Sequence, residues 1–241
     1  MTSIGASTTR SGETRLAIIA ETLVVFLAML GFTWITKSAD LIGAGSIAIW
    51  GAIILATILM KRRGVKWSDY GLSLPKGTKQ WIGTIALSVA VIVTVFASMF
   101  FVIEPLNAFL GLEEAPTASD PFKFFLGKPL VFLAFIVVVV WGGAALGEEL
   151  FLRGYLLNRL GDLFGRTALG WTAALIIHAI IFGSMHVYQG LAGMIGTGII
   201  GFIIGFYYLL GGRRLFPVII AHGVINTVGL TAYYLSDGAI T

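Results

Sequence analysis

Long uncharged stretches alternate with short polar ones along this chain of 241 residues. Most apolar stretches hold about 20 residues, the length that an α-helix needs to cross the hydrocarbon of a bilayer. The pattern predicts an all-α, polytopic integral membrane protein with about seven, that is six to eight, transmembrane helices. The predicted spans are residues 16–35, 41–60, 81–103, 129 to about 160, 167–185, 189–210 and 215 to about 235.

The polar stretches suggest how the chain is divided. We expect a flexible tail over residues 1–15, N-terminal membrane helices and loops over 16–128, a membrane core over 129–236, and a second tail over 237–241. Residues 104–128 are rich in proline and acidic side chains, which predicts a loop with a short interfacial helix at 122–125.

Composition excludes a soluble domain. Hydrophobic residues make up 57% of the chain and charged residues only 12%, against roughly 25% charged in soluble domains. The chain has no cysteine, which excludes disulfides, thiolate metal ligands and a cysteine nucleophile. The formal net charge of +4 is typical of cytoplasmic loops beside anionic lipid. We therefore expect membrane lipid as a partner and no nucleic acid. The sequence does not indicate an oligomeric state.

Lys and Arg are distributed unevenly between the predicted loops. With the N-terminus inside, the outer segments hold only Lys37, Lys123 and Lys128. The inner segments hold the other 13 of the 16, namely Arg10, Arg15, Lys61, Arg62, Arg63, Lys66, Lys76, Lys79, Arg153, Arg159, Arg166, Arg213 and Arg214. This bias predicts a cytoplasmic N-terminus in a bacterial inner (plasma) membrane.

Two adjacent carboxylates and an arginine interrupt the fourth span. Ionised groups at membrane depth are costly, so they indicate a functional site or a buried ion pair. Glu149 and Arg153 are spaced i, i+4 and are predicted to pair on one helix face. Glu148 points elsewhere and is left free to face a cavity, as a general base would. A purely structural ion pair would explain Glu149 and Arg153 but not Glu148.

Later spans carry two more polar pairs at helical spacing. Phe182 and His186 end the fifth span, and His222 and Asn226 lie on the seventh. His222 and Asn226 suit the stabilisation of an oxyanion, although interhelical hydrogen bonding is an ordinary role for such residues. If the fourth span stays helical beyond the Glu pair, all these groups fall at a similar depth. Glu148, His186 and His222 are then also a plausible Zn²⁺ set with an open position. Alternatively, Glu148 and His186 hold a water while His222 and Asn226 polarise a carbonyl.

The order and spacing of these motifs resemble the CAAX protease and bacteriocin-processing (CPBP) family of intramembrane endopeptidases, which includes the Ras-converting CAAX prenyl endopeptidase. The resemblance covers about residues 129–230, so the membrane core is expected to be CPBP-like. It implies a protease in which Glu148 activates water, His186 helps to hold it, and His222 with Asn226 forms the oxyanion hole. Glu149, Arg153 and Phe182 would be supporting residues. The resemblance leaves a metal-dependent and a metal-free glutamate mechanism open, so no cofactor is certain and Zn²⁺ stays an alternative.

The resemblance implies a membrane-associated peptide or protein as substrate. It leaves CAAX processing, bacteriocin maturation and cleavage of other anchored peptides open. Relatives near the prenyl endopeptidase have eight spans, whereas seven are predicted here. Two other hypotheses are a non-catalytic membrane scaffold or bacteriocin self-immunity protein on the same fold, and a proton-coupled transporter. The candidate catalytic residues all lie in the C-terminal half of the chain, and the two halves show no internal repeat. Both observations disfavour the transporter.

Overall fold

The computed structural model describes residues 13–39, 41–112 and 122–238. These residues form helices joined by short turns, with no strand among them, which confirms the all-α prediction. In chain order the helices are α1 (Arg15–Ser38), α2 (Ala44–Arg62), η1 (Trp67–Tyr70), α3 (Gly77–Ser98), η2 (Met99–Ile103), α4 (Glu104–Leu110), η3 (Lys123–Phe125), α5 (Pro129–Phe135), η4 (Ile136–Leu156), α6 (Leu157–Phe164), α7 (Ala168–Ser184), η5 (Val187–Gln189), α8 (Gly190–Leu210) and α9 (Leu215–Leu235).

Six helical stretches of the described chain are long and apolar enough to cross a membrane, and α7 is a shorter apolar helix of 17 residues. At 1.5 Å per residue, α7 is about 26 Å long, close to the lower limit for a span. The prediction of a polytopic membrane protein with six to eight spans is therefore confirmed.

The third span is longer than predicted. Residues 104–110, expected to be loop, continue α3 through η2 into α4. Pro105 closely follows the π-helical residues of η2, where the regular i→i−4 bonding is already interrupted, so this proline does not stop the helix. The short helix expected at 122–125 is present as η3. The predicted tail residues 1–12 and 239–241, and loop residues 113–121, lie outside the described residues.

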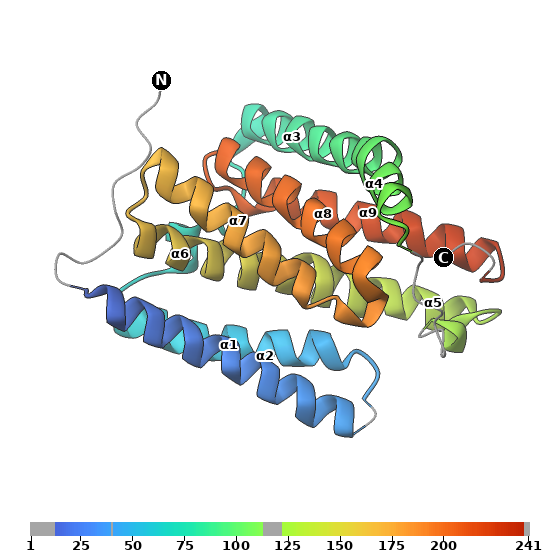
Figure 1. Ribbon diagram of the computed structural model, residues 1–241, viewed down its shortest axis with the longest axis horizontal. Helices are drawn as coiled ribbons and strands as arrows, with labels where there is room; N and C mark the ends of the chain where they lie inside the picture. The colour runs from blue at the N-terminus through green and yellow to red at the C-terminus, as the bar shows by residue number, and fades with distance from the viewer. Residues whose placement is uncertain (1–12, 40, 113–121, 239–241) are drawn as a thin grey trace.

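Successive long helices run in opposite directions, and η4 lies at the centre of the bundle (Figure 1). The α1–α2 hairpin packs on one side of η4 through α2, and α9 packs on another side. Helices α7 and α8 form a closely packed pair, and α3 lies against α9. This arrangement brings residues from η4, α7 and α9 toward the interior of one bundle.

The glycines of α8 let α7 approach closely. A Cβ on Gly201 would lie 2.4 Å from Cδ1 of Phe182, and a Cβ on Gly205 would lie 2.6 Å from Cδ1 of Leu175. Both distances are shorter than any ordinary van der Waals contact, so larger residues would push the helices apart. Small residues at this spacing are typical of tight helix pairs in membranes.

An ion-pair cluster ties α1 and α2 to α6 at one end of the bundle. The buried guanidinium of Arg159 binds Glu13 at 2.7 Å, Glu21 at 3.4 Å and Asp162 at 3.4 Å. Arg63 at the end of α2 binds Glu21 at 3.0 Å. The hydrogen bond from Arg159 is the main cause that holds the pKa of Glu13 below its ordinary value. This part of the predicted flexible tail is thus anchored to the core.

Candidate active site

The helix that carries the Glu pair continues past it. Residues Pro129–Phe164 are one helical stretch, and η4 within it follows the i→i+5 pattern of a π-helix. The side-chain amide of Asn158 donates to the carbonyls of Arg153 (3.0 Å) and Gly154 (2.8 Å), which satisfies two backbone acceptors where η4 gives way to α6. π-Helical turns occur frequently at functional sites. The fourth span therefore stays helical beyond the Glu pair, which is the condition under which the polar groups of the three spans fall at a similar depth.

Glu149 and Arg153 form a completely buried ion pair. Their side chains are 0% exposed, and Nη1 of Arg153 donates to Oε1 of Glu149 at 2.8 Å, as the i, i+4 spacing predicted. The other guanidinium nitrogen, Nη2, donates to the carbonyl of Gly201 on α8 at 3.1 Å. The guanidinium also lies over the ring of Phe182, 4.9 Å from its centroid. Arg153 thus joins η4 to both α7 and α8.

The same carboxylate binds His222 on α9. Nδ1 of His222 lies 2.8 Å from Oε1 of Glu149. Glu149 already accepts a bond from Arg153, so it is a carboxylate and the imidazole is the donor at Nδ1. In its neutral form His222 then carries no proton at Nε2 and can only accept a hydrogen bond there. It can donate a hydrogen bond from Nε2 only as an imidazolium. The bond between His222 and Glu149 joins two helices, so the spacing of residues along either helix does not predict it.

His186 is fixed in a similar way. It follows the end of α7, and its Nδ1 lies 2.9 Å from the carbonyl oxygen of Phe182. A carbonyl can only accept, so Nδ1 carries the proton and Nε2 presents a lone pair. The ring of Phe182 meets the imidazole edge to face at 4.8 Å, and the ring of Tyr188 lies on it at 5.8 Å. Two aromatic side chains and one hydrogen bond therefore set the direction of His186.

Glu148 differs from Glu149 in having no fixed partner. Among the described residues it forms no hydrogen bond or ion pair, and it is half-buried. It lies close enough to His186 and His222 to interact electrostatically with both. Gly147 before it packs on α2, where an added Cβ would lie 3.2 Å from Cγ2 of Ile49. The backbone beside Glu148 thus packs closely on α2, and its carboxylate has no hydrogen bond or ion pair among the described residues.

Asn226 lies one helical turn after His222 and is half-buried. Its amide has no hydrogen bond within the described part of the chain. The structure therefore brings Glu148, Glu149, Arg153, Phe182, His186 and His222 together, and it places Asn226 on the same helix as His222 with a free amide.

Residues 129–228 match the family described as type II CAAX prenyl endopeptidase Rce1-like. The chain carries an Rce1-like domain. The match confirms the resemblance to the CAAX protease family and contains all the site residues predicted from the sequence. The protein is thus an integral membrane protein in which residues 129–228 are similar to a family of CAAX proteases. Searches of curated proteins and of solved structures found no match.

The side chains of the Rce1-like domain do not fit a zinc ion. Within the described residues no three His, Asp or Glu side chains gather closely enough to hold a metal. Glu148, His186 and His222, the set expected from sequence, are near one another but do not form such a group. The other arrangement expected from sequence, in which side chains hold a water, needs only hydrogen bonds to that water.

Sequence reasoning missed Tyr188 of the Rce1-like domain. Its ring packs on His186, and it interacts electrostatically with Glu148. Nε2 of Gln189 donates to the Tyr188 hydroxyl at 3.1 Å, so the hydroxyl keeps its own proton for another acceptor. The ammonium of Lys37, at the end of α1, lies 5.9 Å from the centre of the Tyr188 ring. An aromatic residue two positions after a histidine has no distinctive pattern in an apolar sequence.

The third histidine has a different environment. His178 lies two turns before His186 on α7 and is fully buried, and neither ring nitrogen has a hydrogen-bond partner within the described residues. It packs against α8, where a Cβ on Gly205 would lie 3.5 Å from its Nδ1. This contact between helices agrees with a packing role.

Proposed function

We propose that this protein is an intramembrane endopeptidase that hydrolyses a peptide bond in a membrane-associated substrate. The observation that carries the proposal is the uncommitted carboxylate of Glu148 beside two histidines whose Nδ1 atoms are already bonded. In a non-catalytic scaffold, a partially buried carboxylate without a partner would only lower the stability of the fold. A general base requires one.

In the proposed mechanism His186 accepts a hydrogen bond from water at Nε2, and Glu148 takes a proton from the same water. The water oxygen forms a bond to the carbonyl carbon of the substrate, and the carbonyl π electrons move to oxygen. When the C–N bond breaks, the proton held by Glu148 passes to the leaving nitrogen. Glu148 thus acts first as base and then as acid, so the carboxylate returns to its starting state.

Asn226, His222 and Tyr188 are proposed to stabilise the oxyanion. The amide of Asn226 and the hydroxyl of Tyr188 are neutral donors. His222 donates at Nε2 when it enters the cycle as an imidazolium, whose charge the buried carboxylate of Glu149 balances, and it keeps that proton throughout. Preorganised donors in a water-poor site contribute strongly, because removing one typically costs about 10²–10³ in rate. Glu149, Arg153 and Phe182 act by positioning these groups.

We propose that the substrate approaches from the membrane. The 13-to-3 distribution of Lys and Arg favours an N-terminus in the cytoplasm, and the bacterial inner membrane is proposed because of the resemblance to the CPBP family. Substrates with a prenyl group and substrates with a simple transmembrane anchor both suit such a site, and the experiment compares them.

The decisive experiment is cleavage of a peptide library by purified protein, with prenylated and unprenylated members. Glu148→Gln should lower kcat/KM by at least about 10²-fold while the thermal midpoint is retained. Glu104→Gln, which removes an exposed carboxylate on α4, is the control and should cleave as wild type does. Metal analysis of the same samples tests the alternative route, which a stoichiometric zinc would favour. If both proteins are inert across the library, the scaffold or transporter is favoured instead. If both cleave equally well, Glu148 is not the general base.

A further inference from the structure

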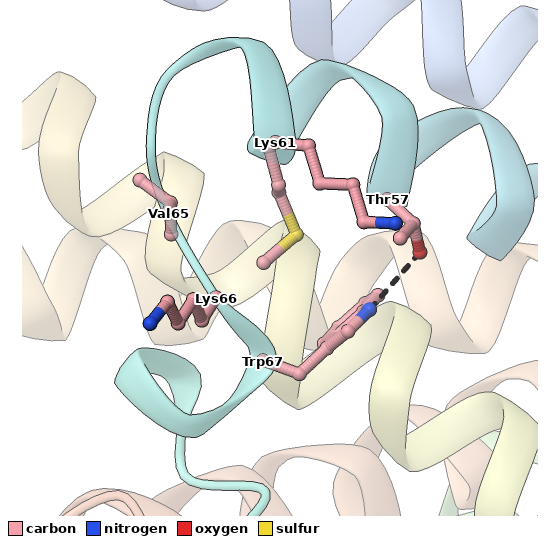
Figure 2. Close-up of a pocket in the computed structure, with 6 residues that line it drawn as sticks. Thr57, Lys61, Val65, Lys66 and Trp67 are labelled. Carbon is pink, nitrogen blue, oxygen red and sulfur yellow. Dashed lines mark hydrogen bonds between the residues drawn. The ribbon is translucent and has the colours of Figure 1, made fainter.

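A pocket of about 160 Å³ lies between the end of α2 and η1, apart from the residues of the candidate active site. It is lined by Thr57, Met60, Lys61, Val65, Lys66 and Trp67. Figure 2 shows α2 and η1 on its two sides, bridged by the hydrogen bond from Nε1 of Trp67 to Oγ1 of Thr57 at 3.0 Å. That bond satisfies the polar group of the indole, so the ring presents only its apolar faces to the pocket.

The pocket combines two chemistries. Its wall is formed by the side chains of Met60 and Val65 and by the Trp67 ring, all apolar. Lys61 and Lys66 line it as well, both are exposed, and Figure 2 shows their ammonium groups at opposite ends of the lining. α2 ends here as a membrane-spanning helix, so the pocket lies where hydrocarbon meets the headgroup region. Tryptophan is enriched at this depth, and basic residues beside a span attract anionic lipid.

We propose that this pocket binds an anionic phospholipid, with part of an acyl chain against Met60, Val65 and Trp67. The phosphate lies at the rim, where the exposed, flexible side chains of Lys61 and Lys66 swing toward it. An amphiphile with one negative charge matches both halves of the pocket. A free anion would leave the apolar wall in water, and a zwitterionic lipid would bring its own cation to the lysines.

A lipid bound in the pocket would affect the central helix, η4. A Cβ on Gly154 would lie only 3.2 Å from Cζ3 of Trp67, so the indole packs directly against the backbone of η4. Gly154 follows Arg153, which holds Glu149. A bound chain that supports the Trp67 ring therefore also supports the helix that carries the Glu pair. This binding site does not depend on the proposed protease activity, because it is tested by binding alone.

The test is native mass spectrometry of the full-length protein in detergent, titrated with phosphatidylglycerol or with phosphatidylcholine of the same chain length. We expect tighter binding of phosphatidylglycerol. Lys61→Gln and Lys66→Gln should each weaken it about fivefold, the factor that corresponds to about 1 kcal/mol for each basic residue. Arg62→Gln is the matched control, since it removes the same charge from an exposed neighbour that does not line the pocket.

Four results would overturn the proposal. Equal affinity for the two lipids would show that charge plays no part. An equal loss in Arg62→Gln would show diffuse attraction and not a pocket. Displacement of the lipid by inorganic phosphate, or equal binding of a short-chain phosphatidylglycerol, would show an anion site without a chain site. Thermal midpoints of all variants, measured without lipid, separate loss of binding from loss of fold.

Discussion

Nδ1 of His222 lies 2.8 Å from Oε1 of Glu149, so the imidazole of α9 binds the second carboxylate of the Glu pair and not the first. Glu149 also binds Arg153 at 2.8 Å. One carboxylate of the pair is thus fully used in joining helices, and the adjacent one has no partner within the described residues. Two neighbouring glutamates in one helix therefore have different environments, and substitutions at them should have different consequences.

Glu149→Gln should destabilise the protein strongly. It removes the charge that balances Arg153 in a completely buried pair, and breaking such a pair typically costs about 3–5 kcal/mol. We expect a clearly lowered thermal midpoint in detergent. Glu148→Gln, whose carboxylate balances no cation directly, should change the midpoint little. Similar midpoints for the two variants would contradict the division of roles.

The double variant Glu149→Gln/Arg153→Met should recover part of this loss. The methionine removes the uncompensated cation while it fills part of the same volume. The pair of substitutions should therefore cost less than the sum of the two single ones, as a double-mutant cycle on thermal midpoints would measure. Additive losses would mean that the 2.8 Å contact contributes no coupling.

Tyr188→Phe should lower kcat/KM by about 10- to 100-fold, the range expected for one hydrogen bond to a charged group. The ring remains and continues to pack on His186, so the thermal midpoint should be retained. Tyr207→Phe is the control, because its hydroxyl bonds Thr94 at 2.8 Å, and Thr94 lies on α3 outside the candidate site. If Tyr188→Phe cleaves as well as this control does, Tyr188 has no part in the reaction.

Gly201→Ala should destabilise the α7–α8 pair by about 1–3 kcal/mol. The new methyl group would lie 2.4 Å from the ring of Phe182, the side chain that also contacts His186 and Arg153. Gly83→Ala on α3 is the matched control, since its Cβ would meet nothing within 4 Å. Thermal midpoints should fall for the first variant and stay level or rise for the second. The reverse order would show that α7 and α8 are not in close contact.

Acid should weaken the anchoring of the N-terminal segment. The pKa of Glu13 is lower in the folded protein than in the unfolded chain, mainly because Arg159 donates a hydrogen bond to it. The stabilisation is therefore fully present above the ordinary glutamate pKa of about 4.3 and is lost as the pH falls through the lower folded value.

Thermal midpoints of wild type and Glu13→Gln, measured from neutral to acidic pH, check this. The wild type should be the more stable at neutral pH, and the two curves should converge in acid. A difference that stays constant with pH would show that the charge of Glu13 is not involved.

Much of the fold follows from the sequence because hydropathy alone decides which segments cross a membrane. Helix length and the pair Glu149–Arg153 were predictable, since both depend on residues near one another in the chain. Residues 104–110 were not, because Pro105 was interpreted as a loop residue although the helix continues past it. Contacts between helices, such as His222 with Glu149, depend on packing that no local pattern encodes.

Glu21 illustrates the same limit. In the structure Glu21 accepts a bond from the hydroxyl of Tyr155 at 2.9 Å and pairs with Arg63 at 3.0 Å. Both partners are far away in the sequence, and only the position of the α1–α2 hairpin brings them together.

The charges of the central helix have consequences for the order of synthesis. Arg159 pairs with Glu13 and Glu21, which leave the ribosome before it, whereas the partner of Glu149 on α9 is made last. Charged residues at the centre of a span cost about 2.5–3.5 kcal/mol each on insertion. Arg159, at one end of this helical stretch, can therefore be paired during translation. Glu149 gains its histidine partner only after α9 has been made. A nascent chain that stops before α9 should thus be a target for membrane quality control.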